Sequence, residues 1–407
     1  MGQTRSVEEL AICGGTPVRK EFLVYGAPDI GAEEIQEVVE CLRSGWLGTG
    51  PRAERFENDV VAYTGAGHAL ATNSCTAAMH LSLLAAGVGS GDEVITTSMT
   101  FGATVNVIEH VGAKPVLVDI AKDSFLIDPD AIEERITEKT RAIIPVHFAG
   151  YPCDMDRINE VAREHDLTVI EDAAHALGAK YDDRMIGEGS NFTCFSFYVT
   201  KNITAGEGGM VVTNDGEVIA RMRCYGLHGM TRGAWQRYAH HGKLHYDIVY
   251  PGYKYNMPDL SASVALQQLK KLEGFIARRA HYAKMYFELL KDQEALVLPT
   301  SLCPTSPSVR CAWHLYPVII RPEKLRCSRD EVMQALIKEN IGAATHFRGV
   351  FEQPYYRDKY GFRGEAFPNA KFVSDHVFSI PLATKLNEQD IQDVVNGLNK
   401  VLSYYSN

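Results

Sequence analysis

Hydrophobic positions between Gly31 and about Gly226 alternate between the three- and four-residue spacing of helices and short, nearly continuous apolar runs. Such runs, bounded by Gly, Asn or Asp, are typical of buried strands. The spacing predicts helices at 33–43, 53–63, 76–86, 103–110, 130–137 and 156–165. The apolar runs predict strands at 68–72, 93–97, 115–119, 141–146, 168–171 and 192–197. Because strands that alternate with helices form parallel sheets, we expect an α/β domain whose sheet is covered on both faces.

The alternation weakens after Asn214, and residues 228–256 are polar, aromatic and without clear periodicity. A loop of this length in a compact chain usually has a function or lies at an interface. A long helix is expected at 260–280, followed by a Pro/Ser-rich stretch at 301–308. Further on, we expect strands at 315–320 and 377–380 and helices at 329–339 and 388–403. The chain is therefore predicted to contain a large α/β domain over 1–278, with an N-terminal arm and an interface loop, and a smaller C-terminal α+β domain over 279–407.

Composition restricts the classes of function. The 407 residues are 45% hydrophobic and 23% charged, as in soluble globular proteins. A net charge of -10 argues against nucleic acid as a partner, and no apolar run approaches the roughly 20 residues of a membrane span. Nine cysteines, an odd number without a Cys-x-x-Cys pair, predict free thiols in a reducing compartment, the cytoplasm. The 14 histidines form no ligand cluster in the sequence, so no metal site is expected.

Three features lie where chemistry is expected. Asp172 ends a predicted strand, at the sheet edge where open α/β folds bind ligands. Lys201 follows another strand and precedes a Gly-rich turn. The segment Asn73-Ser-Cys-Thr-Ala77 joins a strand to a helix, so its backbone amides are placed to hold an anion. Taken singly, such features are more often a helix cap, a solvated lysine and an N-cap than parts of a functional site.

Taken together, the three features match the requirements of pyridoxal 5'-phosphate (PLP). A lysine forms the Schiff base with this cofactor, a carboxylate pairs with its protonated pyridine nitrogen, and a helix N-terminus holds its phosphate. Their joint occurrence in the correct chain order is much harder to obtain by chance than any one of them. The sequence therefore predicts a PLP site.

Several motifs accompany these residues along nearly the whole chain. The most specific is Phe195-Ser-Phe-x-x-x-Lys201-Asn, followed by Gly206-Glu-Gly-Gly209, and Glu171-Asp-Ala-Ala-His175 is another. In these motifs the sequence resembles the fold type I PLP enzymes, and among them the DegT/StrS sugar aminotransferases. The resemblance implies a mostly parallel central sheet flanked by helices, with a smaller C-terminal α+β domain.

The resemblance also implies roles for individual residues. Lys201 would be the Schiff-base lysine and proton shuttle, Asp172 would keep the pyridine nitrogen protonated, and His175 would contact the ring hydroxyl or the substrate. Phe101 would stack on the ring face. The cofactor phosphate would be bound by the amides of Cys75, Thr76 and Ala77, by the hydroxyl of Ser196 and by Asn256 of the neighbouring subunit. Such a shared site requires a homodimer. His346 resembles a substrate-facing position, but a solvated loop histidine explains it equally well, so it stays outside the catalytic set.

The activity implied by the resemblance is the transfer of an amino group from an amino acid, by resemblance L-glutamate, to a nucleotide-linked keto-deoxysugar. Two alternatives remain open: an acceptor that is a cyclitol or another carbocyclic ketone, and a catalytically silent regulator on the same scaffold. Related PLP sugar dehydratases have His where Lys201 stands, which argues against that activity. The nucleotide, the position of the ketone and the face that receives the amine are not predicted.

Overall fold

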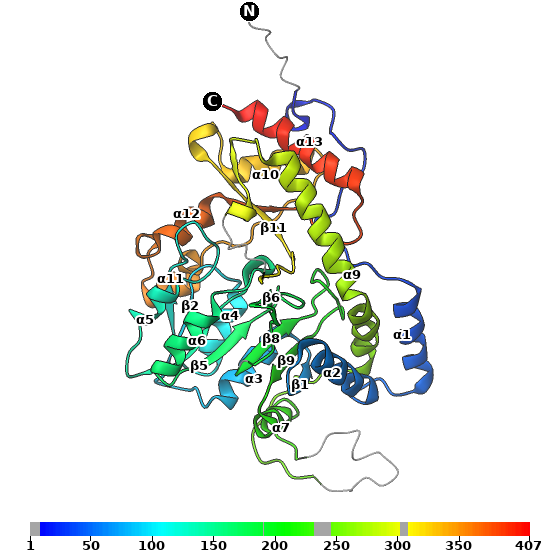
Figure 1. The fold of residues 1–407 in the computed structure, drawn as a ribbon, viewed down its shortest axis with the longest axis vertical. Coiled ribbons are helices and arrows are strands. Elements are labelled where there is room, and N and C mark those ends of the chain that lie inside the picture. Colours follow the sequence, from blue (N-terminus) through cyan, green and yellow to red (C-terminus); the bar gives the residue numbers. More distant parts are fainter. Residues whose placement is uncertain (1–8, 190, 232–245, 302–307) are drawn as a thin grey trace, which may run out of the picture.

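A computed structural model of the chain describes residues 9–189, 191–231, 246–301 and 308–407 (Figure 1). Its main element is a sheet of seven strands in the order β1-β9-β8-β5-β4-β2-β3. The strands are β1 (His68–Thr72), β2 (Glu93–Thr97), β3 (Lys114–Val118), β4 (Thr140–Ile144), β5 (Thr168–Asp172), β8 (Phe192–Ser196) and β9 (Gly209–Thr213). Neighbouring strands are parallel, except that β9 is antiparallel to both β1 and β8.

Helices cover both faces of this sheet because successive strand side chains point to opposite sides. In β1, Leu70 joins one hydrophobic core, whereas Ala69 and Ala71 join another. The helices of the Leu70 face are α3 (Cys75–Ala85), α4 (Gly102–His110) and α7 (Gly216–Tyr225). Those of the other face are α2 (Pro51–Thr64), α6 (Met155–Glu164) and the first half of α9 (Asp259–Leu290), with α1 (Ala32–Ser44) and α5 (Pro129–Glu133) packed outside them.

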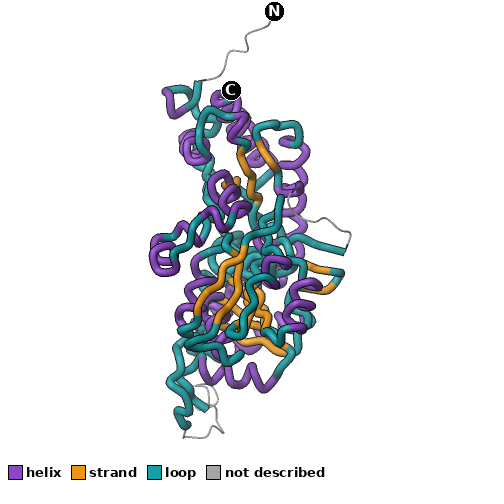
Figure 2. The backbone as a smooth tube through the Cα atoms, turned by 90° about the vertical axis from the view of Figure 1, so that its left-hand side faces the viewer, coloured by secondary structure: helices purple, strands orange, loops and turns teal. Residues whose placement is uncertain are grey.

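A smaller antiparallel sheet lies in the upper part of the molecule in Figure 2, with the large sheet below it. Its strands are β10 (Leu296–Val297), β11 (Tyr316–Ile320) and β12 (Val377–Ile380). The helices that form a core with it are α10 (Arg329–Lys338), α13 (Glu388–Tyr405) and the second half of α9. The remaining elements are the short hairpin of β6 (Lys180–Tyr181) and β7 (Arg184–Met185), and the helices α11 (Pro354–Tyr360) and α12 (Pro368–His376), which pack into the core between the two sheets.

The fold class predicted from the sequence is confirmed: the protein is mixed α/β with a mainly parallel central sheet. Strand β9 is absent from the predicted series of strands. It runs antiparallel to both of its neighbours, whereas the predicted series was parallel. Helix α9 continues ten residues past the predicted end at 280, since Tyr282, Tyr286 and Leu290 pack on the small sheet. Helix α5 ends at Glu133 instead of residue 137. The domain boundary at 278 falls inside α9 and stays a prediction.

The polar segment 228–256 is described only at its two ends, since residues 232–245 lie outside the described part of the chain. Its ends pair with each other through antiparallel bridges between Leu227 and Lys254 and between Met230 and Ile248. Its role at an interface stays a prediction. Most of the predicted Pro/Ser-rich break, residues 302–307, likewise lies outside the description. Among the described helices, none has the length and apolarity needed to cross a lipid bilayer.

Candidate active site

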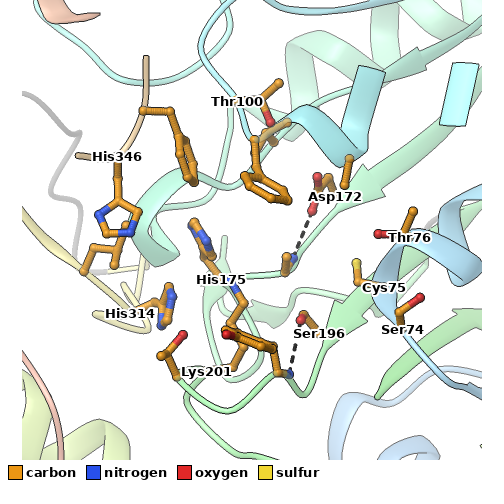
Figure 3. Close-up of a pocket in the computed structure, with 18 of the residues that line it drawn as sticks. Ser74, Cys75, Thr76, Thr100, Asp172, His175, Ser196, Lys201, His314 and His346 are labelled. Carbon is orange, nitrogen blue, oxygen red and sulfur yellow. Dashed lines mark hydrogen bonds between the residues drawn. The ribbon is translucent and has the colours of Figure 1, made fainter. Parts of the chain in front are cut away.

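A cavity of about 450 Å³ lies at the carboxyl ends of the central parallel strands, as expected for an open α/β sheet. This volume is within the range of small-molecule sites, roughly 300–1,000 Å³. Segments of the large sheet and its helices form one side, and segments next to the small sheet, including His314 and His346, form the other (Figure 3). The cavity therefore combines residues that are far apart in the sequence.

Most residues predicted from the sequence meet in this cavity. The predicted residues that line it are Cys75, Thr76, Phe101, Asp172, His175, Ser196 and Lys201. Ala77 and Asn256 do not line it. Strand ends and loops between strands and helices supply most of this set, which is why the order of elements in the sequence could predict it.

Lys201 reaches the cavity from the loop between β8 and β9. Its backbone N–H donates to the carbonyl of Tyr198. The side-chain amide of the next residue, Asn202, donates to the backbone carbonyl of Ala312. These bonds fix the loop to the protein on both sides of the lysine. Burial lowers the pKa of the Lys201 amine to about 8, against the opposing attraction of Asp172. More of the amine is therefore uncharged near neutral pH than in an ordinary lysine, which favours its action as a nucleophile.

Asp172 lies at the end of β5, and hydrogen bonds fix both its backbone and its carboxylate. Its backbone N–H donates to Pro145 and its carbonyl accepts from His147, which extends the pairing with the neighbouring strand. One carboxylate oxygen accepts from Thr104 Oγ1 at 2.7 Å, and the other from the N–H of Ala174 at 3.2 Å. Burial raises the pKa of Asp172, while these two hydrogen bonds lower it. The carboxylate is thus oriented in a nearly water-free setting, where a cationic partner would bind it strongly.

The hydrogen bonds of His175 determine its tautomer. The backbone N–H of Ala149 donates to His175 Nδ1 at 3.2 Å, so this nitrogen is the acceptor. Burial, followed by the nearby Lys201 and His346, lowers the pKa of His175 well below its ordinary value. The ring is therefore neutral and carries its proton on Nε2. It can donate this proton to an oxygen bound in the cavity, such as a ring hydroxyl or a substrate group.

The N-terminus of α3 lies beside Asp172 and Ser196 and forms an anion cradle (Figure 3). Ser74 is the N-cap, and its Oγ accepts from the N–H of Ala77 at 3.1 Å. This differs from the prediction that the Ala77 amide serves the phosphate, because the N-cap already uses it. The amides of Cys75 and Thr76, first in the helix, have no intrahelical carbonyl to bond and remain for a ligand.

Gly209, at the start of β9, is the last glycine of the Gly206-Glu-Gly-Gly209 motif and is required for a steric reason. A Cβ at this position would lie 2.3 Å from the carbonyl carbon of Ser74 and 2.4 Å from the nitrogen of Cys75. Both are backbone atoms that cannot swing away. Only glycine therefore lets β9 approach the anion cradle this closely, and the same approach places the Lys201 loop beside it.

Several residues of the cavity were missed or left aside by the sequence analysis. Thr104 bonds Asp172, while His314 and Phe347 belong to segments more than 100 residues away from the motifs. Phe347 lies 5.9 Å from Phe101 and 6.0 Å from His175, measured between ring centroids. His346, left outside the catalytic set, lines the cavity as well. Of these, only His346 had a signal in the sequence, its resemblance to a substrate-facing position.

Asn256 lies outside the cavity of its own chain. Its side chain donates to Thr49 Oγ1 and accepts from Lys254 Nζ at 2.7 Å. Its backbone pairs with Thr72, at the end of β1. The predicted contact with a partner's phosphate stays a prediction.

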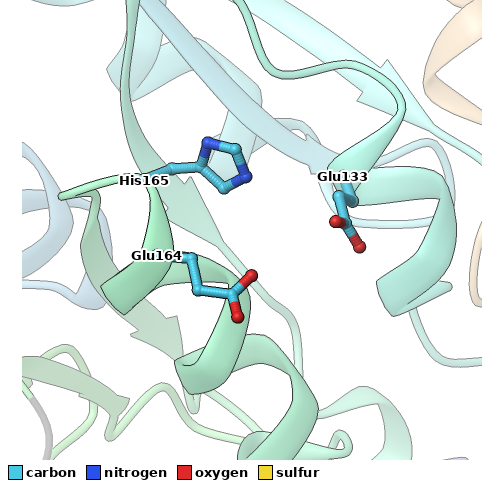
Figure 4. Close-up of side chains that lie close together, drawn as sticks. All are labelled: Glu133, Glu164 and His165. Atoms are coloured by element: carbon cyan, nitrogen blue, oxygen red, sulfur yellow. The ribbon is translucent and has the colours of Figure 1, made fainter.

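The described residues include one surface group with metal-like spacing, formed by Glu133, Glu164 and His165 (Figure 4). One ligand atom from each lies within 4.8 Å of the others, but all three side chains are exposed. Exposed carboxylates often gather without binding an ion, so the group is not evidence for a metal site.

A model of the DegT/DnrJ/EryC1/StrS aminotransferase family matches residues 28–399. The chain belongs to this family. Among curated relatives, the spore coat polysaccharide biosynthesis protein SpsC of Bacillus subtilis is 44% identical over 385 residues, which are 94% of this chain and 98% of SpsC.

Solved structures match this fold over most of the chain. Spr1654 of Streptococcus pneumoniae, assigned as a sugar aminotransferase, matches in its PMP form with a TM-score of 0.87 and 34% identity, covering 94% of this chain and 99% of that one. It has also been solved in a PLP form. DesI, solved with its TDP-sugar product, matches with a TM-score of 0.85 and 30% identity, covering 97% and 96%. This member of the DegT family is thus a PLP-dependent aminotransferase.

Proposed function

We propose that this DegT-family aminotransferase moves an amino group from an amino acid, L-glutamate, to a nucleotide-linked keto-deoxysugar and so forms an amino sugar. The observation that carries the proposal is the convergence of Lys201, Asp172 and the α3 anion cradle in one cavity. The nucleotide-sugar acceptor is supported by DesI, whose product is a TDP-sugar. The relationship to SpsC supports a role in polysaccharide or amino-sugar synthesis.

The residues of the cavity fit PLP chemically. Asp172 is a buried carboxylate for the pyridine nitrogen, the amides of Cys75 and Thr76 and the hydroxyl of Ser196 are donors for the phosphate, and Phe101 offers an aromatic face. When bound, the cofactor supplies an aldehyde carbon that carries the amino group and a ring that withdraws electrons. Lys201 would hold this carbon between turnovers.

The protein's own residues then divide the work. Lys201 Nζ, uncharged in part because its pKa is about 8, takes the proton from the α-carbon of the amino donor. The donor leaves as a 2-oxo acid, and its amino group stays at the site. In the second half-reaction Nζ returns a proton to the carbon that was the ketone of the sugar, which leaves as the amino sugar. His175 Nε2 donates to an oxygen of the ring or substrate throughout.

A decisive test is the variant Lys201→Ala with Lys270→Ala as its control, because Lys270 is an exposed lysine on α9. We expect Lys201→Ala to lose the borohydride-trappable chromophore and amine transfer, and the control to keep both. Purified protein is then assayed with glutamate and a panel of nucleotide keto sugars and cyclitol ketones. Normal turnover by Lys201→Ala, or a colourless protein without cofactor, would refute the proposal. If the enzyme aminates only the cyclitol ketones, the acceptor is a carbocyclic ketone instead of a nucleotide-linked sugar.

We also propose a homodimer in which Asn256 reaches the phosphate of the partner's site. Phe101, although it lines the cavity, is 64% exposed in the single chain, so this side of the site is open. Hybrid dimers test the arrangement. If Asn256 acts across the interface, a dimer of one Lys201→Ala and one Asn256→Ala chain has one site with both native residues and recovers activity. If it acts within its own chain, neither site is intact and activity is not recovered.

The eight cysteines in the described part of the chain are all free thiols. This agrees with a reducing compartment, and we propose the cytoplasm.

A further inference from the structure

Arg279, on α9, is a buried cation without a carboxylate partner among the described residues. It is 3% exposed, and its Nε has no hydrogen-bond partner. Burial lowers the pKa of the guanidinium, but only to about 10, so it remains charged at neutral pH. Buried charges are normally paired with an opposite charge, and an unpaired one calls for an explanation.

The guanidinium lies directly behind the cavity wall. Its Nη1 donates to the backbone carbonyls of Trp313, His314 and Leu382 at 3.3, 3.1 and 2.7 Å. His314 and Leu382 line the cavity, as does Tyr25, whose phenol interacts electrostatically with Arg279. The three carbonyls solvate the charge without neutralising it. A net positive potential therefore extends into this side of the cavity.

His314 connects this charge to the cavity, because its backbone carbonyl accepts from Arg279 and the residue lines the cavity. It is 5% exposed, its ring centroid is 4.4 Å from that of His175, and its Nδ1 is buried without a hydrogen-bond partner. Burial, followed by the surrounding cationic groups, lowers the pKa of His314 well below its ordinary value, so the ring is neutral. A proton on Nε2 leaves only a lone pair at the sealed Nδ1. Nε2–H is then the donor available to a ligand.

We propose that His314, backed by the guanidinium of Arg279, binds the α-carboxylate of the amino donor. This inference rests on one part of the proposed function, namely that the amino donor is an amino acid. The N–H of His314 donates to a carboxylate oxygen, and the charge of Arg279 supplies the opposite sign behind it. Arg279 is a positioning residue, because it also fixes the backbone on which His314 sits.

The placement agrees with what an amino donor requires. Its α-carbon must lie at Lys201 Nζ, and its carboxylate is one bond from that carbon. His314 is close enough to Lys201 that the two interact electrostatically. Lys201 is itself the sole lysine or arginine among the described residues that line the cavity, and the reaction occupies its amine. Near His314, a carboxylate can therefore accept a hydrogen bond from the imidazole and also interact with the unpaired charge of Arg279.

The test measures binding without turnover. Full-length, PLP-loaded protein is titrated calorimetrically with glutarate, a dicarboxylate that lacks an amino group, and with glutaramide as the neutral control. We expect His314→Leu to weaken glutarate binding about tenfold or more, and His314→Gln, which can still donate, to recover part of the loss. Exposed His281, on α9 like Arg279, gives the control variant His281→Leu, expected to bind like the wild type.

Kinetics separate the donor from the acceptor. In His314→Leu we expect the KM for the amino donor to rise about tenfold and the KM for the keto sugar to change less than twofold. A rise confined to the keto sugar, equal glutarate affinity in His314→Leu and wild type, or equal binding of glutaramide and glutarate would each overturn the inference. These results leave the chromophore of Lys201 intact, so they are distinguishable from a failure of the proposed function. Arg279→Met, with near-normal PLP absorbance and weakened glutarate binding, would confirm the charge effect.

Discussion

Removal of the Thr104 hydroxyl is the sharpest probe of how Asp172 is tuned. Thr104 Oγ1 is 2.7 Å from Asp172 Oδ2 and 2.7 Å from Thr100 Oγ1. A threonine hydroxyl has one proton, and the ionised carboxylate can only accept, so Thr104 donates to Asp172 and Thr100 donates to Thr104. The variant Thr104→Val keeps the shape of the side chain and removes this donor.

The expected magnitude follows from the kind of bond that is lost. A hydrogen bond to a charged group contributes about 1.5–3 kcal/mol. Without it, the pKa of Asp172, already raised by burial, rises further, and the carboxylate loses the bond that keeps it ionised and oriented toward a protonated ring nitrogen. If the bond matters fully in the transition state, kcat falls about 10- to 150-fold. Thr100→Val removes only a bond between neutral groups, about 0.5–1.5 kcal/mol, so we expect a fall of about 2- to 10-fold.

The assay is amine transfer at saturating PLP, donor and acceptor, with the absorbance of the bound cofactor followed against pH for each variant. Thermal unfolding of the cofactor-free proteins controls for damage to the core, since both threonines are buried. Thr104→Val turning over within twofold of the wild type would refute the role assigned to the hydroxyl. A larger loss in Thr100→Val than in Thr104→Val would contradict the assignment of the stronger, charge-assisted bond to Thr104.

Two further predictions concern cofactor binding. Gly209→Ala should weaken PLP binding about 5- to 100-fold, because its Cβ would meet backbone atoms of the anion cradle and such overpacking costs about 1–3 kcal/mol. Fluorescence titration measures the affinity, with Gly274→Ala as the control because a Cβ there meets nothing within 4 Å. Equal PLP affinities of the two variants would contradict the prediction. The rate at which cofactor-free protein attaches PLP should rise with pH to a midpoint near 8, because burial lowers the pKa of Lys201 and the uncharged amine forms above that value. Stopped-flow absorbance measures it, and a midpoint near the ordinary lysine value of about 10.4 would exclude this account.

Local pattern predicted the strands of the large sheet well, with the exception of β9. Strands 68–72 and 93–97 coincide with β1 and β2, because each is a short apolar run closed by a turn residue. Strand β9 was missed because its signal, Gly209-Met-Val-Val-Thr213, begins inside a Gly-rich motif that had already been assigned to the lysine loop. Its antiparallel direction depends on pairing with β1 and β8, which is a tertiary property.

The candidate site was predictable where it follows from strand ends. Asp172 and Lys201 could be placed at one sheet edge because parallel strands bring their carboxyl ends together. Arg279 and His314 had no such signal: an arginine in a helix pattern is normally a solvated charge, and its burial results from the small sheet packing over α9. Contacts of this kind depend on how the two sheets and α9 pack together in space, which periodicity does not contain.

The N-terminus of α3 shows that two explanations of one segment can both hold. In the sequence, an N-cap serine and a phosphate site are competing accounts of residues 73–77. In the structure Ser74 takes only the N–H of Ala77, the third amide of the helix. The first two amides and the positive end of the helix dipole remain for an anion. Capping by Ser74 therefore stabilises the helix start without occupying the ligand's donors, and the close contact with Gly209 holds those donors in register with the lysine loop.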